Sequence, residues 1–321
     1  MRAGVSHGGD LGDVQRRYPG APWPWLDLST GINPVPYPLP HLPADLWTRL
    51  PSRAQYDALI AAAARRYGVE DPATIVAAPG TQALIQLLPR LYPPDVAPVA
   101  IVGPTYEEHE VSWRREVAVV RLIDTPDQAR DEEILVVVNP DNPTGRLFDL
   151  KPRRQITVVD EAFIDFLPPA ASIVSRRPEG TIVLRSFGKT YGLGGLRLGF
   201  AIAEPDVAAG LREQLGPWAV SGPALEIGAR ALADDDWLNM SAKRLHSNGK
   251  RLDALLAAAG FSILGGTPLF RLARHDDAPG RVQQLGRHGI HVRAFFLQPD
   301  RLRFGIPGDE AQFERLARAL A

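Results

Sequence analysis

Five short segments of this chain carry side chains whose types and spacing could support a reaction. In chain order they are Gly80-Thr81-Gln82, Gly103-Pro104-Thr105-Tyr106, Asn139-Pro140-Asp141-Asn142-Pro143-Thr144-Gly145, Asp160-Glu161 and Ser186-Phe187-Gly188-Lys189. A lysine amine can form an imine with an aldehyde, and an aspartate can hold a protonated ring nitrogen. A glycine turn that leads into a helix offers backbone N–H groups to a phosphate. Together these groups indicate chemistry on a phosphorylated ring that bears an aldehyde.

Pyridoxal 5'-phosphate is a cofactor that uses every one of these groups. We expect its aldehyde to react with Lys189 and its phosphate to bind at the Gly80 turn. Asp160 would keep the pyridine nitrogen protonated, so that the ring accepts the electrons left when a bond at the substrate α-carbon breaks. Taken singly, a lysine after a strand is usually solvated, and an aspartate at a strand end usually caps a helix. The order in which the five segments occur, each after a strand, favours cofactor binding over these separate ordinary roles.

Short strands are expected to position these residues. Apolar, β-branched runs occupy residues 74–78, 99–102, 134–138, 156–159 and 181–184, and each run is followed by one of the five segments. Continuous apolar runs of this length are typical of strands buried on both faces, as in a parallel sheet covered by helices. Ligands of such sheets bind beyond the carboxyl ends of the strands. We therefore predict that the five segments converge in space.

The chain as a whole predicts an α/β fold in three parts. The proline-rich residues 19–51 predict an extended arm, because proline suits neither a helix interior nor a central strand. Further helices are predicted at residues 54–67, 224–232 and 235–259, and further strands at 269–272, 291–294 and 301–306. The predicted parts are an arm (1–45) that contributes to the small domain and the substrate site, a cofactor-binding large domain with a mostly parallel sheet (46–215), and a smaller α+β domain (216–321).

The composition argues against several classes of protein. The 321 residues carry 36 Lys and Arg against 37 Asp and Glu, so no overall charge favours nucleic acid or an anionic membrane. The absence of cysteine excludes disulfides, thiolate metal sites and a cysteine nucleophile. The seven histidines show no metal-binding spacing; we expect them to be structural or exposed, and we expect no metal. Glycine and proline interrupt the apolar stretches, and the first ten residues lack the apolar core of a signal peptide, which predicts a cytoplasmic protein without a membrane span.

Residues 139–145, 160–163 and 186–189, followed by Gly195-Leu196-Arg197-Leu198-Gly199, resemble the core motifs of fold-type-I pyridoxal-phosphate enzymes. This resemblance implies that Lys189 forms the imine, Asp160 holds the pyridine nitrogen, Asn142 bonds the ring hydroxyl and Tyr106 stacks on the ring. The residues that it assigns to the cofactor phosphate are Gly80, Thr81, Gln82, Ser186 and Arg197. It also implies a homodimer.

Other segments resemble the L-threonine-O-3-phosphate decarboxylases of cobalamin biosynthesis more than the related histidinol-phosphate aminotransferases. They are His7-Gly8-Gly9, Ser29-Thr30-Gly31-Ile32-Asn33-Pro34, Asp160-Glu161-Ala162-Phe163-Ile164-Asp165-Phe166 and Leu184-Arg185-Ser186. Phe163 stands where many aminotransferases have a tyrosine, which favours the decarboxylases. The residues that this resemblance places at the substrate are His7, Gly8, Gly9, Gly31, Ile32, Asn142, Arg293 and Arg303.

Residue chemistry supports two of these substrate contacts independently. An imidazole followed by two glycines, as in His7-Gly8-Gly9, suits a phosphate, because glycine leaves the backbone N–H groups accessible. Alternation along residues 301–306 places Arg303 on one face of a strand with Arg301 and Gly305, where Arg303 could bind a carboxylate. The plain alternatives are a disordered terminus for His7 and a surface arginine for Arg293 or Arg303.

The function implied is pyridoxal-phosphate-dependent decarboxylation of L-threonine O-3-phosphate to (R)-1-aminopropan-2-ol O-2-phosphate. Two alternatives stay open: a histidinol-phosphate or related aminotransferase, and a non-catalytic partner in cobinamide assembly. Two further residues depart from the pattern of the aminotransferases. Leu50 replaces a tyrosine that reaches the neighbouring subunit's cofactor, and Gly188 replaces a hydroxyl residue before the lysine.

Overall fold

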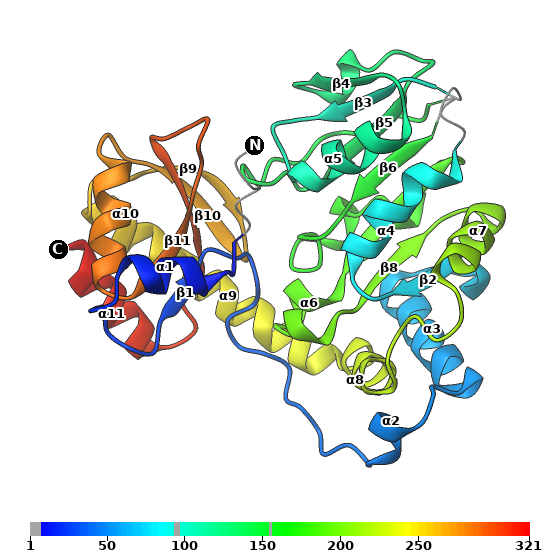
Figure 1. Ribbon diagram of the computed structural model, residues 1–321, viewed down its shortest axis with the longest axis horizontal. Helices are drawn as coiled ribbons and strands as arrows, with labels where there is room; N and C mark the ends of the chain where they lie inside the picture. The colour runs from blue at the N-terminus through cyan, green and yellow to red at the C-terminus, as the bar shows by residue number, and fades with distance from the viewer. Residues whose placement is uncertain (1–7, 93–96, 154–155) are drawn as a thin grey trace. The chain divides into compact units, whose positions relative to one another are not determined.

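The computed structural model of the chain describes residues 8–92, 97–153 and 156–321 (Figure 1). The described chain divides into two compact units. The large unit comprises Pro36–Asn142 and Arg146–Leu238, and the small unit comprises the described part of Met1–Val35 together with Pro143–Gly145 and Asn239–Ala321. The domain limits expected at residues 45 and 215 stay predictions.

The large unit is built on a sheet with the strand order β2-β8-β7-β6-β5-β3-β4. Its strands are β2 (Ile75–Ala78), β3 (Val99–Val102), β4 (Val120–Ile123), β5 (Ile134–Val138), β6 (Thr157–Asp160), β7 (Thr181–Ser186) and β8 (Gly199–Ile202). Strands β3 to β7 pair in parallel, whereas β8 runs antiparallel to both of its neighbours, β7 and β2. The sheet is therefore mostly parallel, as predicted.

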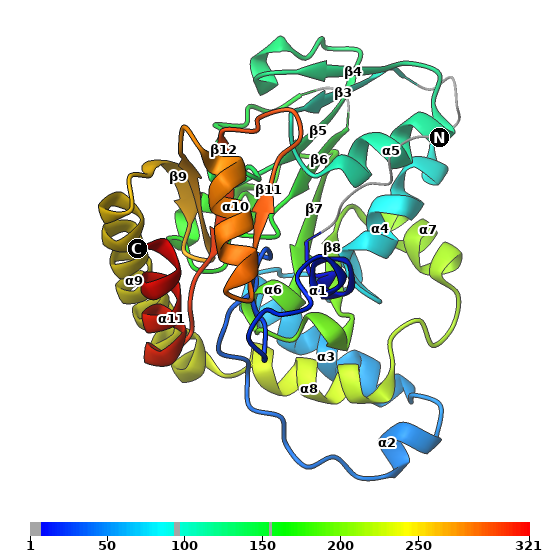
Figure 2. The same cartoon turned by 60° about the vertical axis from the view of Figure 1, so that its left-hand side comes forward.

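Helices cover the sheet because its strands are apolar on both faces. Along β5, Leu135 and Val137 join one apolar cluster, and Ile134 and Val136 join another. The helices of the large unit are α2 (Asp45–Thr48), α3 (Arg53–Tyr67), α4 (Thr81–Leu87), α5 (Glu107–Glu116), α6 (Phe187–Thr190), α7 (Pro205–Leu215) and α8 (Gly222–Leu232). Short 3-10 helices occur at Pro72–Thr74, Leu88–Leu91, Pro126–Gln128, Pro169–Ala171, Val174–Arg176 and Gly194–Leu196. Helices α3 and α8 pack side by side in both ribbon views (Figure 1 and Figure 2).

The small unit contains a sheet with the order β1-β11-β12-β10-β9. Its strands are β1 (Leu26–Leu28), β9 (Ser262–Thr267), β10 (Phe270–Arg274), β11 (Ile290–Ala294) and β12 (Arg301–Gly305). Its helices are α1 (Leu11–Arg17), α10 (Ala278–Arg287), α11 (Glu310–Leu320) and most of α9 (Asp235–Ala258). Strand β1 pairs in parallel with β11, and the other pairs are antiparallel.

Residues 19–51, predicted to be an extended arm with neither a helix nor a central strand, contain one helical turn, which contradicts the prediction, and one edge strand, which does not. Leu26–Leu28 form the edge strand β1, and Asp45–Thr48 form the single turn of α2. Both segments lie between prolines, so their own N–H groups remain able to form hydrogen bonds. The edge position of β1 agrees with the expectation that this stretch would not supply a central strand.

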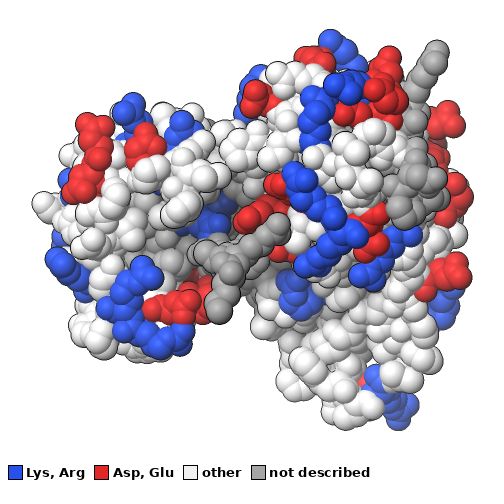
Figure 3. Space-filling model, turned by 45° about the horizontal axis from the view of Figure 1, so that its top comes forward, with Lys and Arg blue, Asp and Glu red and all other residues white. Residues whose placement is uncertain are grey.

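Charged side chains of both signs are interspersed over the face drawn in Figure 3. This pattern agrees with the near balance of 36 basic and 37 acidic residues in the sequence. In the part of the chain that the structure describes, no helix combines the length and the hydropathy that crossing a bilayer requires.

Candidate active site

Several residues predicted to hold the cofactor lie along the side of the large sheet where its parallel strands end. Strands β6 and β7 end there at Asp160 and Ser186. The antiparallel strand β8 begins there at Gly199, two residues after Arg197, and Gly199 pairs with both Ala78 and Ser186. The reversal of β8 thus brings Arg197 to the edge where the parallel strands end.

Asp160 is buried and forms two hydrogen bonds. Its Oδ1 accepts from the Ala162 backbone N–H at 3.0 Å, and its Oδ2 lies 3.0 Å from Nε2 of His109. Burial disfavours the charged carboxylate, but the hydrogen bond with His109, followed by the electrostatic attraction of His109 and Lys189, outweighs burial and lowers the pKa of Asp160. An ionised Asp160 can only accept, so His109 Nε2 donates in this pair. The carboxylate is suited to hold a protonated ring nitrogen.

His109 is a site residue that the sequence reasoning missed. The histidines were expected to be structural or exposed, whereas His109 is 1% exposed and contacts Asp160. A local signal was present, because His109 follows Tyr106 by three residues at the start of α5, and residues with that spacing share one face of a helix. The two rings lie edge to face, with centroids 6.2 Å apart.

Lys189 lies on the one-turn helix α6, directly after β7. Its Nζ lies 4.0 Å from the centre of the Phe163 ring, a cation–π contact. Phe163 is buried, whereas Lys189 is half-buried. The amine is therefore held against an apolar ring.

Arg197 lies against the Gly80 turn, and both features are predicted to bind the cofactor phosphate. Gly80 has a φ of 89°, and a Cβ at this position would lie 2.6 Å from Arg197 Nη2. Arg197 itself adopts a left-handed φ of 55° and donates from Nη1 to the Gly194 carbonyl at 3.0 Å. A Cβ on Gly199 would likewise lie 2.5 Å from the Thr81 backbone nitrogen. A guanidinium placed this close to a glycine turn at the start of a helix suits a phosphate group.

Tyr106 and Gln82 are linked directly. The Tyr106 hydroxyl donates to Gln82 Oε1 at 2.9 Å, and Gln82 Nε2 donates to Glu108 Oε2 at 2.7 Å. Burial, followed by the charges of Glu108 and Asp160, raises the pKa of Tyr106 to about 12. The phenol is therefore neutral at physiological pH, and its ring is held in place, as a stacking role would require. Glu108 was not among the predicted residues.

The loop that carries Asn142 is fixed at its base. Asn139 accepts from the Phe148 backbone N–H at 2.9 Å, and the Asp141 backbone N–H donates to the Arg146 carbonyl at 2.8 Å. Asn142 is half-buried four residues after the end of β5. Its predicted contacts with cofactor and substrate stay predictions, as does the phosphate contact of Ser186.

Three of the predicted substrate residues, Gly8, Gly9 and Arg303, lie against Ser29 in the small unit. The Gly9 backbone N–H donates to Ser29 Oγ at 2.8 Å, and Arg303 Nη2 donates to the Ser29 carbonyl at 2.8 Å. A Cβ on Gly8 would lie 2.7 Å from that carbonyl oxygen. Gly31 and Ile32 follow two residues later in the chain, and His7 lies outside the described residues.

Arg293 and Arg303 occupy directly opposed positions on β11 and β12. Burial, followed by the positive charge of Arg293, lowers the pKa of Arg303 to about 10. Both groups are thus cationic at neutral pH, and like charges at opposed positions repel each other. The carboxylate of Asp27 acts on Arg303 in the opposite direction, as an anionic ligand would.

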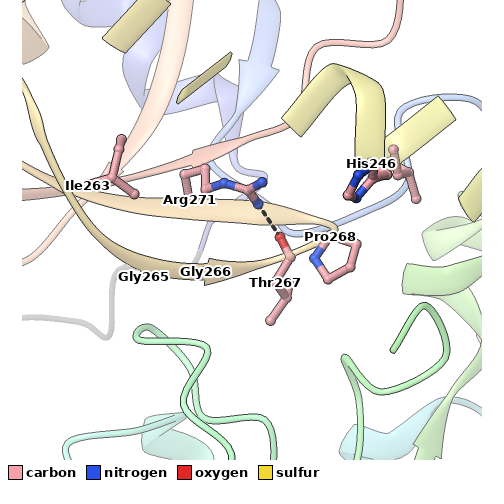
Figure 4. Close-up of a pocket in the computed structure, with 8 residues that line it drawn as sticks. His246, Ile263, Gly265, Gly266, Thr267, Pro268 and Arg271 are labelled. Carbon is pink, nitrogen blue, oxygen red and sulfur yellow. Dashed lines mark hydrogen bonds between the residues drawn. The ribbon is translucent and has the colours of Figure 1, made fainter. Parts of the chain in front are cut away.

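The small unit also holds a pocket of about 360 Å³ that none of the predicted residues lines (Figure 4). His246, Thr267 and Arg271 supply its polar side chains. Arg271 is already engaged, since it donates to Asp253 at 2.7 Å and to the Thr267 carbonyl at 2.6 Å. Among the described residues, no group of three His, Asp or Glu side chains could hold a metal ion.

The chain is similar to several proteins of known name. The family model for class I and II aminotransferases matches residues 41–320. A threonine-phosphate decarboxylase from Pseudomonas aeruginosa is 40% identical, with 98% of this chain and 97% of that protein covered. A threonine-phosphate decarboxylase from Sinorhizobium sp. is 43% identical, with 100% of this chain and 99% of that protein covered.

Among solved structures, histidinol-phosphate aminotransferase from Sinorhizobium meliloti in complex with pyridoxal-5'-phosphate matches with a TM-score of 0.79. That match has 21% identity and covers 100% of this chain and 98% of that one. At this identity the likeness establishes the fold alone. The predicted fold class, a fold-type-I α/β protein with a second, smaller α+β part, is confirmed.

Proposed function

Because the chain belongs to the class I and II aminotransferase family, we propose that it is a pyridoxal-phosphate enzyme that decarboxylates L-threonine O-3-phosphate. The product would be (R)-1-aminopropan-2-ol O-2-phosphate, a precursor in cobalamin biosynthesis. The choice of substrate rests on the similarity, over the whole chain, to two threonine-phosphate decarboxylases. Phe163, which lacks the hydroxyl found at this position in many aminotransferases, supports the same choice.

The described residues fit pyridoxal phosphate in three ways. Arg197 and the Gly80 turn would hold the phosphate, Asp160 would pair with the pyridine nitrogen, and Lys189 would attach the cofactor through its amine. The ring hydroxyl would accept from Asn142, and Tyr106 would lie against the ring face. When bound, the cofactor supplies an electron-accepting ring for the bond that breaks at the substrate α-carbon.

The chain's own residues would control charge and protons during the reaction. His109 keeps Asp160 ionised, so the site opposes transfer of the ring proton to the carboxylate. Lys189 Nζ, which lies beside Phe163, would deliver a proton to the α-carbon that has lost its carboxylate. One CO2 leaves and one proton replaces it, so the reaction requires no oxidant and no keto acid.

The small unit would supply the anion contacts of the substrate. Arg303 and Arg293 are cationic, and the backbone at Gly8 and Gly9 lies beside Ser29 next to Arg303. We propose that this group binds the phosphate or the carboxylate of the substrate, with Gly31, Ile32 and His7 completing it.

A homodimer is proposed from the family resemblance, and exposed apolar side chains of the large unit support it. Leu39, Trp47, Leu50 and Trp218 are 59–68% exposed. A Cβ on Gly222 would lie 2.6 Å from the Leu46 carbonyl oxygen, so α2 packs against the start of α8, close in sequence to Trp47 and Trp218. A second copy of the chain would cover these side chains. The cytoplasmic location stays a prediction from the sequence.

A single incubation experiment separates the proposed activity from its rival. The purified chain with pyridoxal phosphate is incubated with L-threonine O-3-phosphate, or with histidinol phosphate plus 2-oxoglutarate. We expect aminopropanol phosphate from the first mixture and no glutamate from the second. Glutamate from the second mixture, with no CO2 from the first, would favour an aminotransferase.

A further inference from the structure

A buried charge cluster in the large unit has no part in the chemistry described above. Arg185, on β7, donates from Nη1 to Glu161 Oε2 at 3.0 Å and from Nη2 to Asp165 Oδ1. The exposed fractions of the three side chains are 7%, 0% and 8%. Burying these charges is costly, so a specific arrangement must compensate each of them.

The cluster is joined to the neighbours of both central cofactor residues. Glu161 directly follows Asp160, and Thr190 directly follows Lys189. The Thr190 hydroxyl donates to Asp165 Oδ2, the same carboxylate that pairs with Arg185. One guanidinium therefore connects the turn after β6 to the helix after β7.

Glu161 and Arg185 are also held by contacts that do not involve α6. Glu161 accepts from the Ser172 hydroxyl and from the Ile173 backbone N–H, each at 2.7 Å. The Tyr67 ring lies 4.4 Å from the Arg185 guanidinium carbon. These contacts anchor Glu161 and Arg185 without involving α6, so Asp165 and Thr190 form the branch that leads to Lys189.

Helix α6 depends on contacts such as the hydrogen bond from Thr190 to Asp165 because it is only four residues long. One helical turn has no stability of its own in water, so its position depends on tertiary contacts. Phe187 and Tyr191 stack at its apolar side, with ring centroids 4.4 Å apart. The Thr190 hydroxyl supplies a directional polar contact, and a hydrogen bond fixes orientation more narrowly than apolar packing does.

We propose that Arg185, acting through Asp165 and Thr190, is a positioning residue that fixes the Lys189 helix relative to the Asp160 turn. This inference rests on the proposed cofactor chemistry. The spacing between the Lys189 amine and the Asp160 carboxylate is set within the protein before any cofactor binds. Arg185 acts through its neighbours and touches neither substrate nor cofactor.

The test uses Thr190→Val, which removes the hydroxyl and preserves the side-chain shape. Thr190→Ser restores the hydroxyl. The matched control is Thr74→Val, which removes a buried hydroxyl that donates to the Asp71 carbonyl at 2.7 Å, outside the cluster; Ser172 is unsuitable because it also accepts from Arg185. Each variant is measured for unfolding midpoint, for the visible absorbance of bound pyridoxal phosphate as a function of pH, and for kcat and KM. Arg185→Met is left out of the central comparison because an unpaired buried carboxylate can prevent folding.

We expect Thr190→Val to shift the pH midpoint of the absorbance and to lower kcat by about 10- to 100-fold, the scale of a misplaced reacting group. Thr190→Ser should recover both, and Thr74→Val should change the unfolding midpoint only. A Thr190→Val protein with wild-type titration and kcat would overturn the inference, as would equal shifts in Thr74→Val. A wild-type chain that takes up no pyridoxal phosphate would instead overturn the proposed function itself.

Discussion

His109 Nε2 lies 3.0 Å from Asp160 Oδ2, and both side chains are almost completely buried. The two residues are 51 positions apart and belong to α5 and the end of β6. This contact explains how a buried carboxylate retains its charge at the position where a cofactor nitrogen would bind. The charge of Asp160 is thus set by a residue outside its own segment.

Replacing His109 by phenylalanine should destabilise the cofactor-free protein by about 1.5–3 kcal/mol at neutral pH, the range for a hydrogen bond to a charged group. Glutamine at the same position, which keeps an N–H donor, should lose less. The free energy of unfolding in denaturant measures both. Equal stability of the wild-type and His109→Phe proteins would contradict a supporting role for this contact.

The same pair predicts how stability depends on pH. The pKa of Asp160 is lowered from its ordinary value of 3.8, so the ionised carboxylate contributes stability above that pH. The contribution is lost as the pH falls through the lower pKa of the folded state. The stability difference between the wild-type and His109→Phe proteins should therefore shrink in acid, and a difference that stays constant down to acid unfolding would count against the assignment.

Tyr106 should act through its ring rather than through an ionised hydroxyl. Its pKa is raised to about 12, so the phenol is neutral at working pH. Tyr106→Phe removes one neutral hydrogen bond, which is worth about 0.5–1.5 kcal/mol, so pyridoxal-phosphate affinity should fall by no more than roughly tenfold. Tyr106→Ala, which also removes the ring, should lose more. Equal dissociation constants for the two variants would show that the ring makes no contribution.

Arg303 should bind the substrate as a cation. Arg303→Met removes a charged contact worth about 1.5–3 kcal/mol, so KM should rise by about 10- to 100-fold. Arg301→Met, two residues along the same strand, is the matched control and should leave KM near the wild-type value. Because the pKa of Arg303 is lowered to about 10, the wild-type KM should also rise as the pH passes that value. A KM unaffected by Arg303→Met would remove this residue from the substrate site.

The exposed side chains near α2 should control association. Trp47→Glu combined with Leu50→Glu should convert a dimer to a monomer in sedimentation experiments, because both side chains are 68% exposed in the single chain. Trp23→Glu, which alters a 76% exposed tryptophan of the small unit, is the control. A double variant that remains dimeric would place the interface elsewhere, and a monomeric wild-type chain would contradict the homodimer.

The strands that position the site could be predicted because they are continuous apolar runs. Strands β2, β3, β5, β6 and β7 lie at or within one to two residues of the expected runs. Strand β4 is partly exposed and contains Arg121, and β9 contains Gly265 and Gly266, so neither shows a continuous apolar pattern. Strand β8 begins with Gly199 and has a single β-branched residue, Ile202, so it lacks the β-branched run that marks the predicted strands.

The order of the segments also predicted where Asp160 and Lys189 lie, because each follows a buried strand. The sequence could not show His109 beside Asp160, because that contact depends on how α5 packs on the sheet. Nor could the sequence show that the Ser29 carbonyl accepts a hydrogen bond from Arg303, because the two residues are separated by 274 positions. Local pattern identifies the strand ends, and tertiary packing determines which side chains meet there.

The most direct test follows the carboxyl carbon of the substrate. L-threonine O-3-phosphate labelled at that carbon is incubated with the pyridoxal-phosphate-loaded protein and, separately, with Lys189→Ala. We expect the wild-type protein to release the label as CO2 without 2-oxoglutarate, and Lys189→Ala to release none. Label retained in the substrate by the loaded wild-type protein, or released equally by Lys189→Ala, would contradict decarboxylation at this site.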